Sequence, residues 1–321
     1  MNLLITRHDK IGDFVVTLPL FKAIKTQRPT IKVFALVSKI NYEFAQNFEF
    51  IDEVILYDKD DFQGTLKRIK EANIDVSISG FINTHLGWLL FLSGIKKRIG
   101  PATKIAQIFF NKRIKQRRSR VEKREFEYNL DLAKVFDDSL ELNFEKPMLS
   151  FANSDTIDAF RKNYKIEPSK RIVGFHPGYG GSSDGNLSLD DYIKLAKRTY
   201  SLGFQVVFTF GPDDLAVKDE LVNRVDFEAI FYESKGAIID FCKLLSGFEL
   251  FVSTSTGPMH LAGAVNVKTL SFFGDSLFAS SKRWATISEE TNQNNFMLNE
   301  NYSEDNYNNI ENRLVEVLNG K

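Results

Sequence analysis

The sequence predicts an α/β fold of two Rossmann-like, doubly wound domains that face a central cleft. Two observations predict it. Short β-type apolar runs alternate with helical patterns throughout the chain, which is typical of parallel sheets with helices on both faces. The length of 321 residues suits two such domains of about 150 residues each. A passage at residues 137–154, with Pro147 in it, separates the two patterns, so we place the domains at residues 1–152 and 153–321.

The first half alternates strand and helix patterns from its first residues. We expect strands at residues 3–6, 32–37, 53–57 and 76–79. We expect helices at residues 14–24, 42–48, 62–72, 85–92 and 125–136. The uncharged segment 86–95 is about half as long as a membrane span, so we expect a core helix there. Between Asn111 and Arg124 the pattern breaks into a basic, polar stretch.

The second half repeats this alternation. We expect strands at residues 172–175, 205–210, 229–232, 250–253 and 268–272. A helix at residues 189–200 starts after Ser188, with Asp190 and Asp191 near its positive end. The polar, Asn-rich segment 288–309 leads into a last helix at about 309–318. In a two-domain protein of this kind such a helix often packs back on the first domain, and we expect that here.

Composition excludes several classes of protein. Lys+Arg and Asp+Glu both number 42, so the whole-molecule charge indicates no partner. The single Cys242 cannot form an internal disulfide or a thiolate zinc site, which fits a reducing compartment. The first residues lack the features of a secretory signal, so we expect a cytoplasmic protein. The 29 phenylalanines are scattered, which favours packing over a base-stacking surface, and we expect no nucleic-acid partner.

The loop after the first expected strand reads Arg7-His8-Asp9-Lys10-Ile11-Gly12-Asp13. Ligands of open parallel sheets bind at the carboxyl ends of the strands. The loop lacks G-x-G-x-x-G, which disfavours a nicotinamide dehydrogenase. Asp13 falls in the first turn of the next helix, where it either caps that helix or takes a proton from an incoming hydroxyl. Asp9 is a competing base, although Arg7 and Lys10 favour an ion-paired, orienting role for it.

The loop after the strand at 172–175 is rich in glycine and serine. It reads His176-Pro177-Gly178-Tyr179-Gly180-Gly181-Ser182-Ser183-Asp184-Gly185-Asn186. Its unshielded backbone amides suit phosphate oxygens, and the alternative is an ordinary surface loop. We expect Gly180, Gly181, Ser182 and Ser183 to bind the phosphate groups of a ligand.

The loop after the strand at 250–253 is the most informative. It carries the hydroxyls of Ser253-Thr254-Ser255-Thr256, then Gly257, and Pro258 at the first helical position. The positive end of the following helix suits a diphosphate. We expect Ser255, Thr256, Gly257 and His260 to surround this anion site. A lone histidine near a helix start is otherwise a structural residue.

A dense basic run lies in the first half. It contains Lys112, Arg113, Lys115, Arg117, Arg118, Arg120, Lys123 and Arg124, interrupted among charges only by Glu122. Such runs are usually solvated faces. In a neutral chain the clustering favours a phosphorylated lipid ligand at an anionic membrane. Arg7, Lys10, Arg117, Arg118 and Arg120 are the residues expected to bind it.

The sequence Asp58-Lys59-Asp60-Asp61 contains the D-x-D pattern by which another transferase fold holds a divalent ion. It directly precedes the helix expected at 62–72, so an N-cap at Asp60 or Asp61 explains it. We therefore expect no metal.

Motifs spread over nearly the whole chain resemble glycosyltransferase family 9, the lipopolysaccharide heptosyltransferases. The matching stretches are Arg7-x-Asp9-x-Ile11-Gly12-Asp13 with Thr17-Leu18-Pro19, Arg118-Ser119-Arg120 to Glu127-Tyr128-Asn129, His176-Pro177-Gly178, Gly211-Pro212-Asp213-Asp214, Ser255 to Ala262, and Phe273-Gly274. The resemblance implies a GT-B fold, an inverting, metal-independent transfer, ADP-heptose bound by the second domain and a glycolipid acceptor against the first. Asp13 matches the base of the family, and Thr256, Gly257 and His260 match donor-contacting positions.

Two positions depart from the family pattern. The loop at 179–187 has no lysine, and Ser255 stands where an acidic residue is common. The leading expectation is a cytoplasmic glycosyltransferase, peripheral at the inner membrane, that moves heptose onto a lipopolysaccharide or lipooligosaccharide core. The alternatives are a sugar-nucleotide epimerase of the same fold and a non-catalytic sugar-nucleotide-binding protein.

Overall fold

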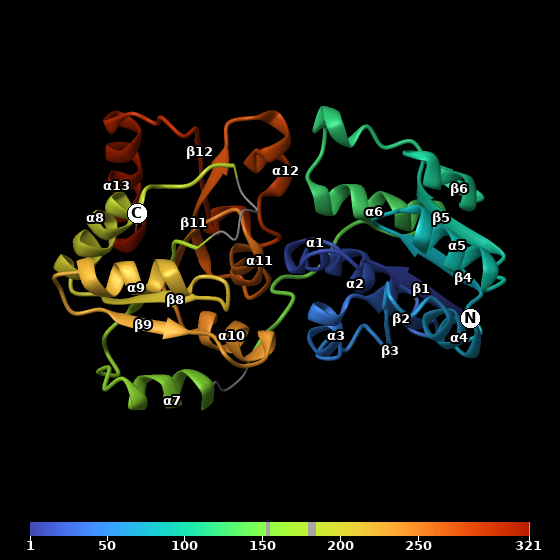
Figure 1. Ribbon diagram of the computed structural model, residues 1–321, viewed down its shortest axis with the longest axis horizontal. Coiled ribbons are helices and arrows are strands. Elements are labelled where there is room, and N and C mark those ends of the chain that lie inside the picture. Colours follow the sequence, from blue (N-terminus) through green and yellow to red (C-terminus); the bar gives the residue numbers. More distant parts are fainter. Residues whose placement is uncertain (152–154, 179–183, 321) are drawn as a thin grey trace. The chain divides into compact units, whose positions relative to one another are not determined.

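The computed structural model describes residues 1–151, 155–178 and 184–320. They form two compact units, Met1–Glu145 (unit 1) and Lys146–Lys321 (unit 2) (Figure 1). The division falls inside the passage at 137–154 where the sequence predicts a domain boundary. The expected boundary at 152/153 itself lies outside the described residues.

Unit 1 is one parallel sheet with helices on both faces. Its strands are β1 (Asn2–Thr6), β2 (Lys32–Val37), β3 (Glu53–Leu56), β4 (Val76–Ser79), β5 (Lys97–Pro101) and β6 (Lys112–Ile114). Its helices are α1 (Ile11–Val15), α2 (Leu18–Gln27), α3 (Lys39–Ala45), α4 (Phe62–Glu71), α5 (Thr84–Leu92), α6 (Glu125–Phe136) and the short 3-10 helices η1 (Ile105–Phe109) and η2 (Arg118–Arg120). The strand order β3-β2-β1-β4-β5-β6 is the Rossmann order.

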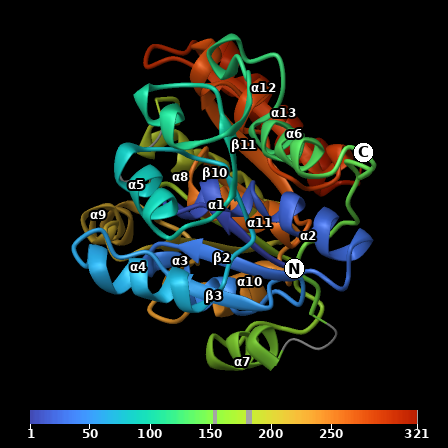
Figure 2. The same cartoon turned by 90° about the vertical axis from the view of Figure 1, so that its right-hand side faces the viewer.

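The two faces of this sheet are covered by different helices. Figure 2 shows α4 and α5 on one side of the strands and α2 and α6 on the other. Alternate residues of β1 serve the two faces, and Leu3, Leu4 and Ile5 are all fully buried. A strand that is buried on both faces is apolar along its whole length, which explains the continuous run in the sequence.

The helix expected at 14–24 is interrupted. α1 ends at Val15, and α2 begins after Thr17, with a proline in its first turn. The Thr17 hydroxyl donates to the Asp13 carbonyl at 2.8 Å. Pro19 lacks the N–H that a continuing helix would need, so a new helix starts there. Asp13 therefore lies in the first turn of a short helix.

α5 differs from its expectation as a core helix. It buries Leu86, Gly87, Leu89 and Leu90, but Trp88, Phe91 and Leu92 are exposed. The segment is apolar around its whole circumference, so the sequence pattern alone does not reveal that one side has no partner. Across the described ranges, no helix combines the length and the apolar character that crossing a membrane requires.

Unit 2 repeats the architecture. Its strands are β7 (Ile172–His176), β8 (Gln205–Phe210), β9 (Ile230–Glu233), β10 (Leu250–Thr254), β11 (Lys268–Gly274) and β12 (Gln293–Leu298). Its helices are α7 (Asp155–Asn163), α8 (Leu189–Ser201), α9 (Leu215–Arg224), α10 (Ile238–Leu245), α11 (Gly257–Ala264), α12 (Ser281–Trp284), α13 (Glu304–Leu318) and the 3-10 helices η3 (Leu277–Ala279) and η4 (Glu290–Asn292). The strand order β12-β11-β10-β7-β8-β9 is the same Rossmann order read from the other edge. The expectation of two doubly wound domains is confirmed.

Capping and packing set the helices of unit 2. The Ser188 hydroxyl accepts from the Asp191 amide at 3.2 Å, so it caps α8 as expected. The last helix, α13, begins at Glu304, earlier than expected. Its apolar side, including Ile310 and Leu314, joins the core of unit 2.

Three of the described strands were not predicted from the sequence: β5, β6 and β12. β6 crosses the basic stretch and pairs with β5 at the sheet edge. β12 lies in the Asn-rich segment, where the Asn294 amide donates to the Thr269 carbonyl at 3.0 Å and its oxygen accepts from Arg313 at 2.7 Å. A polar segment can form a strand when its side chains make hydrogen bonds to neighbouring elements. The partners of Asn294 lie about 20 residues or more away in the sequence, so the pattern around β12 does not reveal them.

Gly174, in the middle of β7, provides a test of this packing. An added Cβ would lie 2.6 Å from Phe248 Cδ2 and 2.8 Å from Phe251 Cδ2, and both rings are buried. We expect Gly174→Ala to lower the free energy of unfolding by about 1–3 kcal/mol because the core becomes overpacked. Gly236→Ala is the matched control, since its nearest neighbour is Asp240 Oδ2 at 3.5 Å. Urea denaturation of both variants would contradict this packing if they unfolded at the same midpoint.

Candidate functional site

The three loops singled out in the sequence leave strands at the switch points of the two sheets. In each sheet the strand order changes direction between two central strands, which is called the switch point. These strands are β1 and β4 in unit 1 and β7 and β10 in unit 2. Crevices for ligands form at the carboxyl ends of these strands. Loops 7–13, 176–186 and 254–260 follow β1, β7 and β10. Each expected loop therefore lies where its own sheet provides a binding position.

Arg7, directly after β1, is the centre of a buried ion-pair cluster in unit 1. Its side chain is 3% exposed. Its guanidinium donates to Asp9 Oδ1 at 2.8 Å, pairs with Asp13 and lies 3.6 Å from Glu125 Oε1. The Asp13 carboxylate remains 17% exposed. The cluster thus fixes Asp13 from the protein side while leaving part of it open.

α6 contributes the rest of this cluster. Glu125, in the first turn of α6, is almost fully buried and also pairs with Arg118. The Asn129 amide donates to the Val16 carbonyl and to Thr17 Oγ1, both at 3.1 Å, and so attaches α6 to the junction of α1 and α2. Glu125 and Asn129 were not expected as site residues. The sequence offered two signals for them. Glu125 is an acid in the first turn of a predicted helix, and Asn129 belongs to the Glu127-Tyr128-Asn129 motif.

The electrostatics of the cluster favour a protonatable Asp13. Arg7 and Arg118 face three carboxylates, those of Asp9, Asp13 and Glu125. Burial raises the pKa of the Asp13 carboxyl above its ordinary value, the Arg7 guanidinium lowers it, and the other two carboxylates add to the increase. Burial alone would lower the pKa of Arg7, but the three carboxylates raise it, so Arg7 keeps its charge. A carboxylate with a raised pKa and partial exposure is chemically suited to accept a proton.

The expected acceptor-binding residues divide into two groups. Lys10, Arg117 and Arg120 are exposed. Arg7 is buried and ion-paired, and Arg118 bonds Gln116 Oε1 at 2.8 Å besides pairing with Glu125. Both guanidiniums are thus engaged in the ion-pair cluster. Asp9 is ion-paired with Arg7, which is the orienting arrangement expected for it.

A second polar cluster at the same end of the sheet was not expected from the sequence. The His8 ring lies 4.3 Å from the Tyr57 ring, and His8 Nε2 is 3.0 Å from Asn83 Nδ2. The Tyr57 hydroxyl lies 2.7 Å from His85 Nδ1. Burial lowers the pKa of His8 to about 4, so its ring is neutral near pH 7. These residues follow β1, β3 and β4, and only the fold brings them together.

In unit 2, the expected donor residues surround the start of α11. Thr256 is the N-cap residue, and its hydroxyl donates to the Thr254 carbonyl at 3.3 Å. Ser255 and Gly257 are half-buried. His260 is buried, and among the described residues its Nδ1 has no hydrogen-bond partner. Burial lowers the pKa of His260 to about 4, so it is a neutral group beside the helix start.

The two described ends of the glycine-rich loop are fixed to neighbouring strand ends. A Cβ on Gly178 would lie 2.6 Å from Asp214 Oδ2, and the same carboxylate oxygen accepts from the Gly211 amide at 2.8 Å. A Cβ on Gly185 would lie 2.5 Å from the Gly274 nitrogen, and the Thr254 hydroxyl donates to the Gly185 carbonyl. Both glycines are therefore required by close approach. The expected donor residues Gly180, Gly181, Ser182 and Ser183 lie outside the described residues.

The D-x-D sequence has a structural explanation. The Asp61 carboxylate accepts from the Gly64 amide at 2.8 Å and so caps α4, as expected. Asp58 accepts from the Asp60 amide at 2.9 Å in the turn that precedes it.

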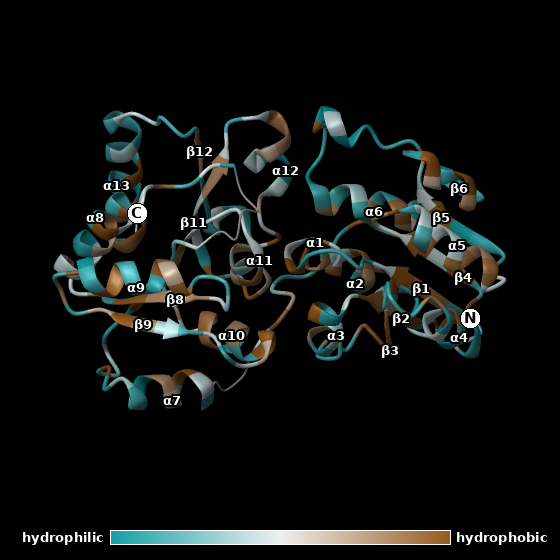
Figure 3. Ribbon diagram, in the orientation of Figure 1, coloured by the Kyte–Doolittle hydropathy of each residue, from teal (hydrophilic) through white to brown (hydrophobic). Residues whose placement is uncertain are grey.

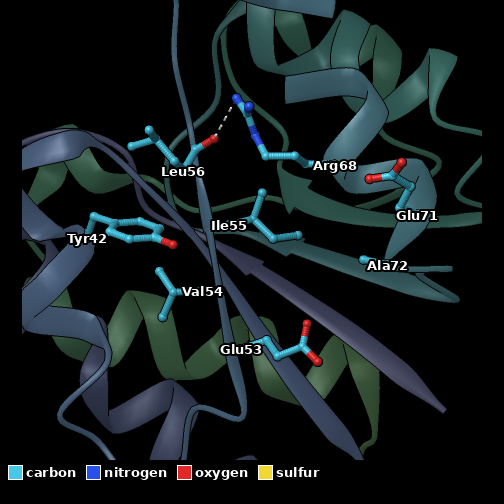
Figure 4. Close-up of a pocket in the computed structure, with 8 residues that line it drawn as sticks. All are labelled: Tyr42, Glu53, Val54, Ile55, Leu56, Arg68, Glu71 and Ala72. Carbon is cyan, nitrogen blue, oxygen red and sulfur yellow. Dashed lines mark hydrogen bonds between the residues drawn. The ribbon is translucent and has the colours of Figure 1, made fainter. Parts of the chain in front are cut away.

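A cavity of about 540 Å³ opens beside edge strand β3, away from these residues (Figure 4). Its lining consists of Tyr42, Glu53, Val54, Ile55, Leu56, Arg68, Glu71 and Ala72. Arg68 donates to the Leu56 carbonyl at 3.5 Å across it, which partly covers the open edge of the sheet. None of the expected site residues lines this cavity.

Comparison with known proteins agrees with the fold and the motifs. Residues 65–314 match the family model described as glycosyltransferase family 9 (heptosyltransferase). A Haemophilus influenzae protein named "Putative glycosyltransferase" is 37% identical over 300 residues, which are 90% of this chain and 86% of that protein. Lipooligosaccharide heptosyltransferase 2 of Campylobacter jejuni is 23% identical over 39% of this chain and 40% of its own.

Solved structures show the same architecture. The structure titled E. coli ADP-heptose lps heptosyltransferase II matches with a TM-score of 0.80 and 16% identity, over 100% of this chain and 98% of that one. This likeness supports the GT-B fold class. The family match covers more than half of the chain, and the motifs lie at the strand ends where a transferase site forms. The chain belongs to glycosyltransferase family 9 and is a glycosyltransferase.

Proposed function

We propose that this glycosyltransferase transfers heptose from ADP-heptose to a lipopolysaccharide or lipooligosaccharide core acceptor at the cytoplasmic face of a membrane, without a metal ion. The heptosyltransferase description of the family and the names of two of the matched proteins support this choice of donor and acceptor. The observation that carries the mechanism is the ion-pair cluster around Arg7, which keeps Asp13 partly exposed beside the end of β1.

Asp13 is the proposed base. The acceptor oxygen attacks the anomeric carbon of the donor sugar, the bond from that carbon to the diphosphate oxygen breaks, and the acceptor proton passes to the Asp13 carboxylate. The negative charge of Asp13 also favours the positive charge that develops on the sugar. Arg7 and Asp9 are proposed as positioning residues, because Arg7 pairs with Asp13 and Asp9 pairs with Arg7.

Unit 2 is the proposed donor-binding part. The diphosphate is already a good leaving group, so it needs fixed hydrogen-bond donors rather than a proton. The amides around Thr256 and Gly257 at the start of α11 provide such donors. Gly180, Gly181, Ser182 and Ser183 are proposed to complete this group, with Ser255 and His260 beside it. Lys10, Arg117 and Arg120 are the exposed cations proposed to bind acceptor phosphates.

Asp13→Asn tests the base. We expect kcat/KM to fall by about 10²–10⁴, the usual contribution of a positioned base, while ADP affinity is unchanged because the proposed donor residues lie in unit 2. The assay is ADP release from ADP-heptose with and without a core acceptor, and an epimerase would not require the acceptor. Asp60→Asn is the control, since it makes the same charge change at an exposed turn residue. Parental turnover in Asp13→Asn would rule out the proposed base.

The pH dependence of kcat/KM is a second test. Only the ionised carboxylate can accept a proton, so activity decreases as pH falls through the pKa of Asp13. Because burial raises that pKa, we expect the acid limb to lie above about pH 3.9, the value of an ordinary aspartate. A profile that stays flat down to that pH, with the protein still folded by circular dichroism, would contradict the assignment.

Gly185→Ala tests the donor loop. The added Cβ would contact backbone atoms of Phe273 and Gly274, which cannot rotate away, so the loop must shift. We expect ADP to bind at least about tenfold more weakly. At 100 times the parental Kd, ADP stabilises the folded parent by about 2.7 kcal/mol, and a thermal-shift titration should show a smaller stabilisation of the variant. Gly236→Ala, which has room for its Cβ, should keep the parental affinity. Equal ADP affinity in both variants would show that this loop does not take part in donor binding.

A further inference from the structure

Unit 1 exposes a continuous group of large apolar side chains on α5 and η1. Trp88, Phe91, Leu92, Ile105 and Ile108, which we call the α5–η1 patch, are between 44% and 80% exposed. Figure 3 shows the hydrophobic character of much of the α5 ribbon. Scattered exposed apolar residues are ordinary, but a contiguous group marks an interaction surface.

The α5–η1 patch is built on a fixed base. The Phe109 ring lies against Gly87, where an added Cβ would be 2.9 Å from Phe109 Cγ. The centroid of the Trp88 ring lies 5.2 Å from that of Phe109 and 5.7 Å from that of Phe91. The opposite side of α5, including Leu86 and Leu90, belongs to the buried core. The fold therefore holds these apolar groups outward, although their burial would be favourable.

The charged residues near the α5–η1 patch favour an anionic partner. Residues 76–121 contain no aspartate or glutamate, and their ten basic residues are Lys96, Lys97, Arg98, Lys104, Lys112, Arg113, Lys115, Arg117, Arg118 and Arg120. Arg98 lies over the Phe91 ring at 5.4 Å, and Lys104 lies over the Phe81 ring at 4.4 Å. On neighbouring α4, the exposed Lys67 is paired with Glu71 at 3.8 Å. Arg98 and Lys104 therefore add positive charge beside the patch, in a chain whose net charge is zero.

Apolar side chains with a tryptophan and a rim of lysine and arginine complement an anionic phospholipid surface. Tryptophan favours the interface between headgroups and acyl chains, and basic side chains bind the lipid phosphates. A second copy of this chain fits less well, because pairing two identical patches would bring both sets of cations together. The lipid surface is thus the occupant that satisfies both the apolar and the charged groups.

We propose that unit 1 docks on anionic phospholipid membranes through the α5–η1 patch, with Trp88, Ile105 and Ile108 entering the headgroup region and the surrounding lysines holding lipid phosphates. The inference deepens the proposed function, because a docked enzyme meets a glycolipid acceptor in the membrane. Docking itself does not depend on the identity of the donor or on Asp13.

Trp88 allows a direct measurement. Trp88 and Trp284 are the two tryptophans of the chain, so Trp284→Phe leaves Trp88 as the fluorescent probe. The probe is titrated with phosphatidylcholine vesicles that contain or lack phosphatidylglycerol. We expect a blue shift of Trp88 emission and quenching by brominated acyl chains with the anionic vesicles, and a much smaller response with the neutral ones.

Variants at exposed positions separate the apolar and charged contributions. Ile105→Ser with Ile108→Ser should weaken binding to anionic vesicles at least about tenfold, because two apolar side chains no longer enter the lipid. Lys96→Glu with Lys112→Glu should weaken it at least about fivefold for each lysine lost. The control is Leu215→Ser with Val222→Ser, a pair of exposed apolar residues on α9, which should bind as the parent does.

Two outcomes would overturn the proposal. One is Trp88 emission that does not respond to anionic vesicles. The other is a dimer, found by light scattering without lipid, that the Ile105 and Ile108 substitutions dissociate, since the patch would then join two copies. Docking and catalysis are tested separately. Asp13→Asn should bind vesicles as the parent does, even if it loses turnover. The Ile105 and Ile108 substitutions should leave turnover of a soluble acceptor unchanged, even if they weaken vesicle binding.

Discussion

The buried guanidinium of Arg7 organises the end of unit 1 that carries the proposed base. It extends from the residue directly after β1 and meets carboxylates from its own loop, from α1 and from α6. A buried cation is tolerated only when it is paired and hydrogen-bonded, so these three elements must come together when the unit folds. Removing one partner would leave an uncompensated charge in the interior. The position of Asp13 thus follows from an electrostatic requirement of the fold, and its partial exposure follows from its place at the outer side of the cluster.

Much of this arrangement could be predicted from the sequence because the signals are local. Continuous apolar runs predicted the central strands β1, β2, β7, β8 and β10, and the residue types after β1, β7 and β10 indicated the three loops. Asp61 and Ser188 could be expected as caps from the residues that follow them. The edge strand β12 was missed because its Asn294 side chain is satisfied by Thr269 on a neighbouring strand. The edge strand β6 was missed because Lys112 and Arg113 are exposed and basic, and only backbone pairing with β5 makes this segment a strand. The break between α1 and α2 was missed although Thr17 and Pro19 carried a signal for it.

The parts of the site that the sequence did not reveal depend on contacts between distant residues. The stretch that contains Glu125 and Asn129 could be recognised as a motif, but the sequence does not indicate that these residues meet Arg7, more than a hundred residues away. The His8, Tyr57 and His85 cluster likewise forms only when three strand ends meet. The α5–η1 patch is a related case. Its charge could be counted in the sequence, but its exposed side could not be distinguished from its buried side, because α5 is apolar all round.

Burial outweighs the Arg7 ion pair at Asp13, so the pKa of this carboxyl lies above its ordinary value. The most direct measurement is an NMR titration of side-chain carboxyl carbons in the free protein, with Asp13→Asn to assign the signal. We expect a midpoint for Asp13 above about 3.9, the reference value for aspartate. A midpoint below that value would mean that Arg7 dominates, and that Asp13 is an ion-paired structural residue rather than a base.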